Sequence, residues 1–429
     1  LGCAKALVDS ERLITELRAR GYQIAPSYDG ADLVVVNTCG FIDAAKKETI
    51  DTIIAQVQRK GRGKLKKVYA MGCLTERYRV DLSHEIPEVD RFFGSDELED
   101  ILRELGGNLR QNLLGERMLS TPSHTAYLKI SEGCDNPCAF CAIPLMRGRH
   151  VSRPLESLAD EARRLIDKGV RELVVIGQDT TCYGLDLYGR RRLADLLLTL
   201  ADLPGIRWVR LLYAFPAKFP REVLDLIAQH PRICKYLDMP VQHASDAVLR
   251  SMRRGISSHA LRELLETVRQ RIPGVALRTT LIVGYPNEGA AEFEELLEFV
   301  RTQRFDRLGV FTYSLEEGTA AYPLGDPVPQ AEKERRLGVV MEAQREIALA
   351  KNEALIGTRL PVLVEREEDG RYVGRSERDA PEIDNEVYIA SERPLPLGSF
   401  QAVLIDDATE YDLYGTTDAV DSFSQVKER

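Results

Sequence analysis

The sequence predicts an α/β protein with three parts: an N-terminal doubly wound parallel α/β domain, a central partial (βα)6 barrel and a small C-terminal antiparallel β-barrel. Three observations predict this architecture. Short Val-rich runs alternate with amphipathic stretches over residues 1–105, six longer strand–helix units follow, and the last part changes to short β-rich runs. Strand–helix alternation is typical of parallel sheets, whereas closely spaced short strands are typical of small barrels.

The N-terminal part contains two runs that predict buried parallel strands, because they are short and rich in Val. They are LVVVNT at 33–38 and KVYAMG at 67–72. Amphipathic stretches predict helices over 9–20, 41–60 and 96–105. We expect the first helix to begin at a cap formed by Asp9 or Ser10 and to end before Gly21. A linker rich in Gly and Asn, over 106–124, should end the domain 1–105.

Six strand candidates, each leading toward a helical stretch, follow in the central part. They are TAYLKI (125–130), ELVVIG (172–177), RWVRLLYA (207–214), KYLDMPV (235–241), ALRTTLIVG (276–284) and RLGVFTYS (307–314). A long helical stretch over 331–357 closes this part, so we expect the second domain over 125–357. Six units are too few for a closed eight-fold barrel. They predict a partial barrel, open on one side, with its chemistry at the carboxyl ends of the strands.

The last part, 358–429, has short β-rich runs separated by charged residues, Pro or Gly, which predicts a barrel of about five strands. Residues 361–429 hold 17 acidic and 7 basic side chains, whereas the first 360 residues hold 50 and 51. An acidic module of this kind repels phosphate and attracts a basic partner. The alternative is that these charges only keep the surface soluble.

The composition predicts a folded chain that does not cross a membrane. Hydrophobic residues make up 44% and charged residues 29%, and no apolar run approaches the roughly 18 residues of a membrane helix. The chain has eight cysteines and no apparent secretory signal, so we do not expect a disulfide framework. Clustered cysteines in a reducing compartment favour metal binding, and we expect a cytoplasmic protein.

The strongest motif is SEGCDNPCAFCAIP, in which Cys134, Cys138 and Cys141 have a CxxxCxxC spacing directly after the first predicted barrel strand. Iron–sulfur clusters are held by Cys thiolates, usually four. Three thiols on one short loop can hold three irons of a 4Fe-4S cluster. The fourth iron then stays open to a substrate, as catalytic zinc sites keep one open position. The alternative is a zinc loop with a ligand that is distant in sequence.

Three further cysteines, Cys3, Cys39 and Cys73, are separated by about one βαβ unit each. Each follows an apolar strand or what is left of one, and the carboxyl ends of parallel strands lie along one edge of a sheet. We therefore expect these three thiols to converge and to hold a second, auxiliary cluster. The alternative is that they are ordinary core residues. For Cys182 and Cys234 we favour that simpler role of packing or lone thiols.

The CxxxCxxC loop, with Phe140 just before its last Cys, resembles the signature of the radical S-adenosylmethionine (SAM) superfamily. The order of an α/β domain with three cysteines, such a barrel and a TRAM-like β-barrel resembles the radical SAM methylthiotransferases over the whole chain. Within that family, three segments resemble the RimO branch rather than the tRNA-modifying branch. They are LGCAKALVDSE (1–11), GQDTTCYGLDLYG (177–189) and GRSERDAPEID (374–384).

The resemblance implies an enzyme that replaces a β-carbon hydrogen of an aspartate in a small-subunit ribosomal protein, protein twelve, with a methylthio group. It implies two 4Fe-4S clusters, one SAM for radical formation and a second SAM as methyl donor. Expected partners are the basic ribosomal protein or the ribosome, an electron donor such as flavodoxin or ferredoxin, and a sulfur source. Two alternatives stay open: a tRNA adenosine methylthiotransferase with the same chemistry, and a non-catalytic iron–sulfur adaptor for the ribosome or RNA.

Beyond the cluster ligands the sequence predicts no catalytic residue, but it does predict SAM contacts. They are Phe140, Gln178, Arg153 and Gly284. Gln178 ends the second barrel strand, and Gly284 ends the fifth within LIVGYPNE, which resembles the superfamily's adenine-contacting segment. Arg149, Arg153 and Arg254 are candidates to pair with a carboxylate of SAM or of the substrate, since Arg binds carboxylates bidentately. The alternatives are that Gly284 only forms a turn and that these arginines are solvated.

Overall fold

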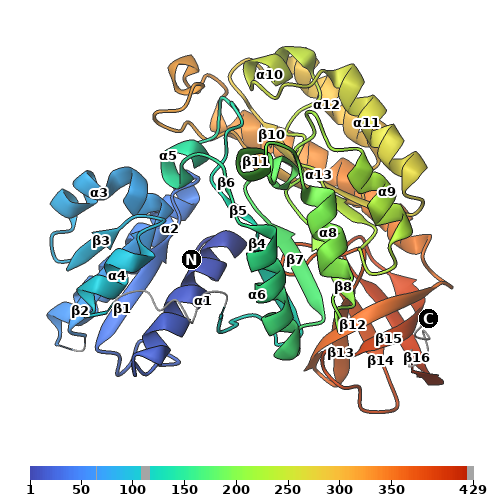
Figure 1. Cartoon of the computed structure of the whole chain (residues 1–429). Coiled ribbons are helices and arrows are strands. Elements are labelled where there is room, and N and C mark those ends of the chain that lie inside the picture. The colour runs from blue at the N-terminus through green and yellow to red at the C-terminus, as the bar shows by residue number, and fades with distance from the viewer. Residues whose placement is uncertain (64, 108–115, 423–429) are drawn as a thin grey trace.

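Figure 1 shows the computed structural model of the chain, which describes residues 1–63, 65–107 and 116–422. The N-terminal domain, blue in the figure, and the C-terminal barrel, red, flank the central barrel on different sides. Residues 108–115 of the predicted linker and residues 423–429 of the C-terminal domain lie outside the described part. Over the described ranges, no helix has the length and apolar character needed to cross a membrane.

The N-terminal sheet has three parallel strands in the order β1, β2, β3. The elements of this domain are β1 (Leu33–Thr38), β2 (Lys67–Gly72), β3 (Arg91–Phe93), α1 (Ala4–Ala19), α2 (Asp43–Gly61), α3 (Cys73–Glu85) and α4 (Leu98–Glu104). Both predicted strands are confirmed. Apolar side chains of α2 and α3, such as Ile53 and Leu82, cover one face. Those of α1 and α4, such as Leu17 and Ile101, cover the other, which is the doubly wound arrangement.

Helix α1 begins earlier than the sequence predicts. Cys3 is its N-cap, with extended backbone, so the prediction that Asp9 or Ser10 caps it is wrong. Both side chains are used elsewhere: Asp9 pairs with Lys129 and Arg147, and the Ser10 hydroxyl accepts a hydrogen bond from a side chain of β1. Cys3 therefore lies at the start of α1.

The predicted linker is not a loose connection where the structure describes it. Arg117 is almost fully buried, and its Nε lies 3.0 Å from Glu11 Oε2 on α1. Its Nη1 lies 3.5 Å from Glu161 Oε1 on α6 (Leu155–Asp167). A buried charge is tolerated only where it is paired, so these two carboxylates hold residues 116–124 against both domains.

The six predicted barrel strands are confirmed, and those that pair do so in parallel. They are β4 (Thr125–Lys129), β7 (Glu172–Ile176), β8 (Trp208–Leu211), β9 (Tyr236–Asp238), β10 (Ala276–Val283) and β11 (Arg307–Thr312). The sheets β4–β7–β8 and β9–β10–β11 are joined by a parallel bridge between Val209 and Ile233. β4 and β11 are the outer strands of this arc, which is the open barrel that the sequence predicts.

Helices cover the outer face of the arc, where Leu128, Val175 and Leu277 project into the main core. Besides α6 they are α8 (Leu193–Ala201), α9 (Glu222–Gln229), α11 (Ser258–Arg271), α12 (Ala290–Gln303) and α13 (Gln330–Glu353). Shorter elements form the loops: β5 (Ser131–Glu132), α5 (Ile143–Arg147), β6 (Val151–Ser152), η2 (Thr180–Cys182), α7 (Leu185–Tyr188), α10 (Asp246–Ser251) and η3 (Tyr322–Leu324). The predicted closing helix over 331–357 is α13.

The other face of the strands is filled by the two flanking domains. Tyr127, Val174 and Tyr236 project from it into one apolar cluster that also contains Val8 of α1 and Leu363 of the C-terminal barrel. Left open, this face would expose apolar surface at a cost of roughly 25 cal/mol per Å². The flanking domains therefore complete the core of the central one, and this packing fixes where α1 and its capping cysteine lie.

The C-terminal domain is a closed barrel with the strand order β12–β13–β14–β16–β15. The strands are β12 (Arg359–Glu368), β13 (Arg371–Ser376), β14 (Val387–Ala390), β15 (Phe400–Ala408) and β16 (Leu413–Ser422). Neighbouring strands are antiparallel, as predicted, except that β14 and β16 pair in parallel. The reason is topological, since a closed ring with an odd number of strands cannot alternate in direction throughout.

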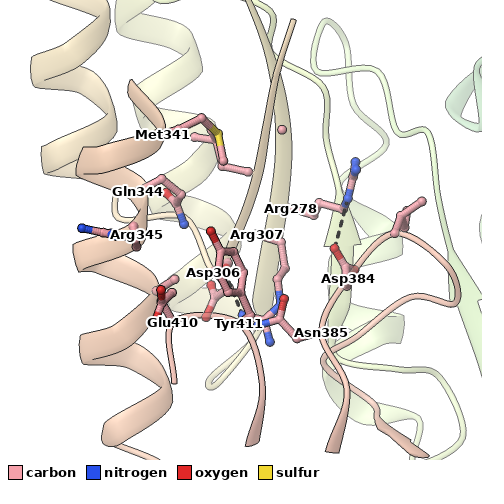
Figure 2. A pocket seen from close by; sticks show the side chains of 14 residues that line it. Arg278, Asp306, Arg307, Met341, Gln344, Arg345, Asp384, Asn385, Glu410 and Tyr411 are labelled. Atoms are coloured by element: carbon pink, nitrogen blue, oxygen red, sulfur yellow. Dashed lines mark hydrogen bonds and ion pairs between the residues drawn. The ribbon is translucent and has the colours of Figure 1, made fainter. Parts of the chain in front are cut away.

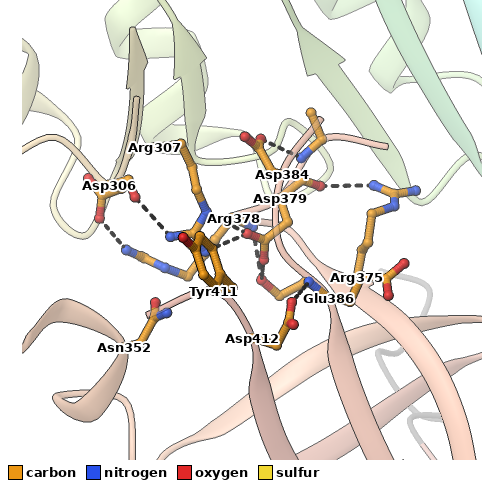
Figure 3. A network of polar contacts seen from close by, with 12 residues as sticks. Asp306, Arg307, Asn352, Arg375, Arg378, Asp379, Asp384, Glu386, Tyr411 and Asp412 are labelled. Atoms are coloured by element: carbon orange, nitrogen blue, oxygen red, sulfur yellow. Dashed lines mark hydrogen bonds and ion pairs between the residues drawn. The ribbon is translucent and has the colours of Figure 1, made fainter. Parts of the chain in front are cut away.

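A network of ion pairs and hydrogen bonds joins the C-terminal barrel to the amino ends of the central strands (Figure 3). The segment 374–384, whose sequence resembles the RimO branch, supplies the residues on one side of this network. The contacts are Arg375 with Glu172 at 2.6 Å, Asp379 with Arg307, and Asp384 with Tyr236 at 2.6 Å. All six side chains are buried or nearly so. This segment therefore serves as a clamp between domains.

A cavity of about 190 Å³ lies beside this clamp, between α13 and the C-terminal barrel (Figure 2). Its charged groups are largely paired with one another or with the clamp. Arg278, for example, lies 3.3 Å from Asp384 and 3.0 Å from Asp238. The cavity opens at the amino ends of the strands, the end opposite to the cysteine loop, and belongs to the contact between the domains.

Candidate iron–sulfur and SAM site

The CxxxCxxC loop starts beyond the carboxyl end of β4 and leads into α5. Two backbone hydrogen bonds shape it. The N–H of Cys134 donates to the carbonyl of Gly148 at 3.1 Å, and the N–H of Cys141 donates to the carbonyl of Cys138 at 3.2 Å. The first bond ties the start of the loop to the end of α5, and the second forms a tight turn between the last two cysteines. The three thiols are thereby held in one short loop.

The thiols of this loop are partly buried and influence one another. Burial, the main cause, raises the pKa of Cys134 to about 11 and that of Cys141 to about 12, and the other thiols of the loop act in the same direction. Only a nearby positive group would make several thiolates stable together here. Metal ions supply such charge and bind the thiolate form of Cys.

Arg254 brings one fixed positive charge to the loop. Its Nη1 donates to Cys138 Sγ at 3.2 Å, and its Nη2 donates to the carbonyl of Pro240. The guanidinium also lies 4.3 Å from the centre of the Phe215 ring, and the residue is only 4% exposed. Arg254 is therefore buried and not solvated, and its candidate role of pairing with a carboxylate of SAM or of the substrate stays a prediction.

Cys39 and Cys73 lie side by side at the carboxyl edge of the N-terminal sheet, as the strand ends predict. Each directly follows the last residue pair of the β1–β2 ladder. Cys3 lies near them at the start of α1. Its chain neighbour Gly2 is so close to Cys39 that a Cβ added to Gly2 would lie 3.8 Å from the Cβ of Cys39. The fold thus brings together three thiols that are far apart in the sequence.

The three N-terminal thiols also affect one another electrostatically. Burial raises the pKa of Cys39 and of Cys73, and the Cys3 thiol acts in the same direction on both. Burial alone would raise the pKa of Cys3 as well, but the Lys5 charge and backbone N–H groups at the start of α1 lower it. Cys3 is therefore the most readily ionised of the three.

Arg147, the last residue of α5, contacts one thiol of the N-terminal set. Its Nε donates to Cys73 Sγ at 3.1 Å. Its Nη1 lies 2.8 Å from Asp9 Oδ2 on α1 and 3.4 Å from Glu132 Oε2 on β5. Helix α5 packs against α3 at this point. One side chain of the central domain therefore reaches the cysteine edge of the N-terminal domain, where α5 and α3 pack together.

The donor chemistry of both sets fits iron–sulfur clusters. Within the described ranges, no three His, Cys, Asp or Glu side chains surround one point closely enough to hold a single metal ion. A 4Fe-4S cluster binds each thiolate at a different iron, so its ligands stand farther apart than those of one ion. Each site has three thiols, and the loop 134–141 contains no His, so the ligands match an iron–sulfur cluster in kind and number.

Two of the predicted SAM contacts lie near the cysteine loop. Phe140 is half-buried and packs against an apolar cluster that includes Tyr285 and Tyr313. Gln178 lies beyond the end of β7, where its Nε2 donates to Glu132 Oε1 at 2.6 Å. Its Oε1 is buried and has no hydrogen-bond partner in the described part of the chain. Gln178 thus has a free acceptor at the expected place.

The other two predicted contacts have structural partners. Arg153 Nη2 lies 2.7 Å from Glu161 Oε2, and its Nη1 donates to the carbonyl of Lys129 at 3.0 Å. Gly284 has φ +75°, and a Cβ there would come within 2.4 Å of Lys333 Cγ. Gly284 is therefore needed for the close approach of α13, and both SAM contacts stay predictions without further support from the geometry.

Several buried polar atoms at the carboxyl ends of the barrel strands lack a hydrogen-bond partner. They were not predicted as site residues from the sequence. Among the described residues they include Ser131 Oγ after β4, Gln242 Oε1 after β9 and the Tyr313 hydroxyl after β11. Gln242 also has φ +72°, which non-glycine residues rarely adopt. An unpaired buried polar group costs about 1–3 kcal/mol, so this rim fits a bound polar molecule such as SAM. In the sequence, only their positions at the ends of predicted strands could have indicated these residues.

Cys182 and Cys234 belong to neither set. The Cys182 thiol donates to Asp179 Oδ2 at 3.2 Å, and Cys234 is buried in an apolar cluster. Burial is the main reason that the pKa of Cys182 is raised to about 12. This geometry agrees with the prediction of lone thiols.

Family comparisons cover most of the chain. Residues 1–94 match the Uncharacterized protein family UPF0004, residues 128–300 match the Radical SAM superfamily, and residues 356–417 match the TRAM domain. With the partial barrel and the three-cysteine loop, these matches define a radical SAM enzyme, a class that uses a 4Fe-4S cluster and SAM. Closer relatives narrow the assignment. The chain belongs to the RimO family of methylthiotransferases.

Two relatives show how far the similarity extends. A protein of Chloroherpeton thalassium named Ribosomal protein uS12 methylthiotransferase RimO is 53% identical over 420 residues, which are 97% of this chain and 96% of that protein. A protein of Cytophaga hutchinsonii with the same name is 50% identical over 418 residues, with the same two coverages of 97% and 96%.

Among solved structures, the radical SAM methyltransferase TsrM from Kitasatospora setae, with a tryptophan substrate and a SAM analog bound, has a similar fold. Its TM-score is 0.55 at 15% identity, and the match covers 86% of this chain and 77% of that one. The cobalamin-dependent radical enzyme OxsB has a TM-score of 0.50 at 13% identity, covering 78% and 53%. Both likenesses concern the fold alone.

Proposed function

We propose that this protein is a ribosomal protein methylthiotransferase. It replaces a β-carbon hydrogen of an aspartate in small-subunit protein uS12 with a methylthio group, and a second SAM donates the methyl group. The relatives that carry the uS12 methylthiotransferase name are 53% and 50% identical over nearly the whole chain, which supports this substrate. A ribosomal substrate places the enzyme in the cytoplasm.

The observation that carries the proposal is the presence of two three-thiol sets, one in each of two domains that meet where Arg147 of α5 donates to Cys73. In the proposal, Cys134, Cys138 and Cys141 hold the 4Fe-4S cluster that binds SAM. Cys3, Cys39 and Cys73 hold an auxiliary 4Fe-4S cluster, to which we assign the handling of sulfur. We place the domains over 1–105, 125–357 and 358–429, so that each set belongs to a different domain and the substrate enters between them.

Side chains of this chain prepare the place where the reaction occurs. With cluster and SAM bound, a radical SAM site supplies a radical able to break an unactivated C–H bond. Such chemistry requires a dry site, and Phe140, Tyr285 and Tyr313 contribute apolar surface beside the cysteine loop. Gln178 and Gln242 offer buried, unpaired acceptors that can orient the polar groups of SAM.

The partners follow from charge and chemistry. Ribosomal proteins are basic, and the C-terminal barrel exposes Asp406, Asp407 and Glu392, which complement a basic surface. Reduction of the SAM-binding cluster requires a low-potential donor such as flavodoxin or ferredoxin. The sulfur that is inserted requires a separate sulfur source.

The test separates the roles of the two sets of thiols. Purified holoenzyme variants are incubated with SAM, a sulfide source and a reductant, together with uS12 or small ribosomal subunits. We expect Cys138→Ala to lose both 5′-deoxyadenosine formation and the methylthio mass on uS12. Cys39→Ala should still form 5′-deoxyadenosine but leave uS12 unmodified. Cys182→Ser is the matched control, because it keeps the hydrogen bond to Asp179 and should modify uS12 normally.

Two outcomes would contradict the proposal. Full modification of uS12 by Cys39→Ala would remove the auxiliary cluster from the reaction. An unchanged uS12 mass in cells with and without the gene would remove the protein substrate. A change in methylthiolated adenosine in tRNA from the same cells would then point to the tRNA-modifying alternative with the same two-cluster chemistry.

A further inference from the structure

Arg147 is a buried side chain of the central domain that hydrogen-bonds a thiol of the N-terminal domain. Its side chain is 3% exposed, and its Nε lies 3.1 Å from Cys73 Sγ. The two residues are 74 positions apart in the sequence. Arg147 follows the cysteine loop of its own domain closely, yet its hydrogen bond goes to a cysteine of the other set.

The guanidinium is held in place by two carboxylates from different elements. Asp9 Oδ2 on α1 lies 2.8 Å from its Nη1, and Glu132 Oε2 on β5 lies 3.4 Å from the same nitrogen. Lys129 pairs with both carboxylates, so positive and negative charges balance in this cluster. A planar guanidinium that is fixed at its Nη1 presents its Nε–H in one direction only. Here that direction is toward Cys73.

We propose that Arg147 is a positioning residue that raises the reduction potential of the auxiliary cluster through its charge and its hydrogen bond to Cys73. This inference rests on the proposed function, in which Cys3, Cys39 and Cys73 hold that cluster. Reduction adds one electron and makes the cluster more negative. A buried cation and an N–H donor to a ligating sulfur stabilise the more negative state, and hydrogen bonds to sulfur are known to tune cluster potentials.

Arg254 is the counterpart of Arg147 at the other cluster. Its Nη1 lies 3.2 Å from Cys138 Sγ, and the Pro240 carbonyl and the Phe215 ring hold it there. Each set of thiols therefore has its own buried guanidinium on one of its three sulfurs. The effects of the two arginines should be separable, because each donates to a cysteine of a different cluster.

The experiment is a redox titration of both clusters, followed by electron paramagnetic resonance, in the reconstituted full chain. The variants are Arg147→Gln, Arg254→Gln and, as the control, Arg149→Gln, whose side chain is 90% exposed. A Cys134→Ala background isolates the auxiliary cluster, and a Cys39→Ala background isolates the SAM-binding cluster. The readout is the midpoint potential of each cluster and does not depend on turnover.

We expect Arg147→Gln to make the auxiliary cluster harder to reduce. At a given applied potential its reduced-to-oxidised ratio should fall about tenfold, which is a shift of about 59 mV for one electron, while the SAM-binding cluster is unchanged. Arg254→Gln should lower the midpoint of the SAM-binding cluster and leave the auxiliary cluster unchanged. Arg149→Gln should change the midpoint of neither cluster. An unchanged auxiliary midpoint in Arg147→Gln, or equal shifts of both clusters, would overturn the inference.

Failure of the inference and failure of the proposed function are distinguishable. A wild-type chain that reconstitutes only the SAM-binding cluster overturns the two-cluster proposal, and the inference with it. Two clusters with an unchanged midpoint overturn only the role of Arg147. If Gln at position 147 prevents the auxiliary cluster from assembling, Arg147→Met is titrated instead. Met has an unbranched side chain but neither the charge nor the N–H donor, so a lowered midpoint supports the inference and a wild-type midpoint overturns it.

Discussion

At the residue scale, Glu172, the first residue of β7, is a fully buried charge that pairs with two arginines. Its Oε1 lies 2.7 Å from Arg210 of the central barrel, and its Oε2 lies 2.6 Å from Arg375 of the C-terminal barrel. Burial alone would raise its pKa, but the two guanidinium groups hold the pKa of Glu172 at about 2. One carboxylate therefore links two domains and remains ionised in the core.

We expect Glu172→Gln to lower the free energy of unfolding at pH 7 by about 3 kcal/mol, the equivalent of moving the Glu pKa from 4.5 to about 2. A depressed folded-state pKa stabilises the fold above about pH 4.5, and this contribution is lost as the pH falls toward 2. The difference between wild type and variant should therefore shrink between pH 5 and pH 3 in denaturant unfolding curves.

Glu332 supplies the control for this prediction. Arg335 and Arg336 also hold its pKa at about 2, but the Glu332 side chain is 31% exposed, and the buried Arg336 keeps a second carboxylate partner, Glu288. Solvent and salt screen such pairs, so Glu332→Gln should leave the unfolding curves nearly unchanged at every pH. A Glu172→Gln difference that stays constant from pH 7 to pH 3 would contradict the assigned ionisation.

At the element scale, the end of β2 determines where Cys73 lies. Gly72 has φ +112°, and a Cβ there would lie 2.7 Å from Asn37 Oδ1 and 2.9 Å from the Thr38 carbonyl oxygen. The chain therefore turns from strand to helix against the neighbouring strand with no room for a side chain. This close approach puts Cys73 next to Cys39 at the sheet edge.

Gly72→Ala should displace Cys73 and weaken the auxiliary site without affecting the CxxxCxxC loop. The left-handed backbone costs an L-residue about 1–2 kcal/mol, and the contact with a backbone oxygen adds to it. We expect the iron bound after reconstitution to fall by about half, from two clusters toward one. Gly169→Ala is the control, since Gly169 has φ +106° but its added Cβ would meet no atom closer than 4.0 Å. An equal loss of iron in both variants would contradict this account.

At the scale of the whole molecule, the C-terminal barrel is fixed to the central one by buried charges. Asp379 pairs with Arg307, and Arg378 Nη2 lies 2.7 Å from Asp306 Oδ1 (Figure 3). These acidic side chains are buried in ion pairs and do not contribute to the charge of the surface. The negative surface that we propose to meet a basic substrate depends instead on exposed residues such as Asp406 and Asp407.

We expect Asp379→Asn to loosen the C-terminal barrel, because it leaves the buried Arg307 without its carboxylate. Removing one partner of a buried ion pair typically costs about 3–5 kcal/mol. The variant should show a separate, earlier unfolding transition in calorimetry and faster proteolysis between α13 and β12. Asp406→Asn, on the exposed part of β15, should keep the wild-type profile. A single unshifted transition in Asp379→Asn would argue against the clamp.

The elements that were predicted correctly have strong local patterns. The Val-rich runs that became β1, β2 and β7 are short and apolar on both faces, as buried parallel strands must be. Two N-terminal elements were not predicted because their patterns are weak. β3 has three residues, and α3 has non-helical backbone at Tyr78. The start of α1 was misplaced because Asp9 and Ser10 resemble a helix cap but are used in tertiary contacts.

The fold class, the two sets of cysteines and the strand ends beside which they lie could be predicted from the amino-acid sequence, because strand periodicity and motif spacing are local properties. The contacts of Arg147 with Cys73 and of Arg254 with Cys138 could not be predicted and are seen only in the folded structure. The same holds for the burial of the segment 374–384 as a clamp. These contacts depend on tertiary packing, within the central domain for Arg254 and between domains for Arg147 and the clamp. A long charged side chain takes its partner from whichever surface covers it, and no spacing along the chain encodes that surface.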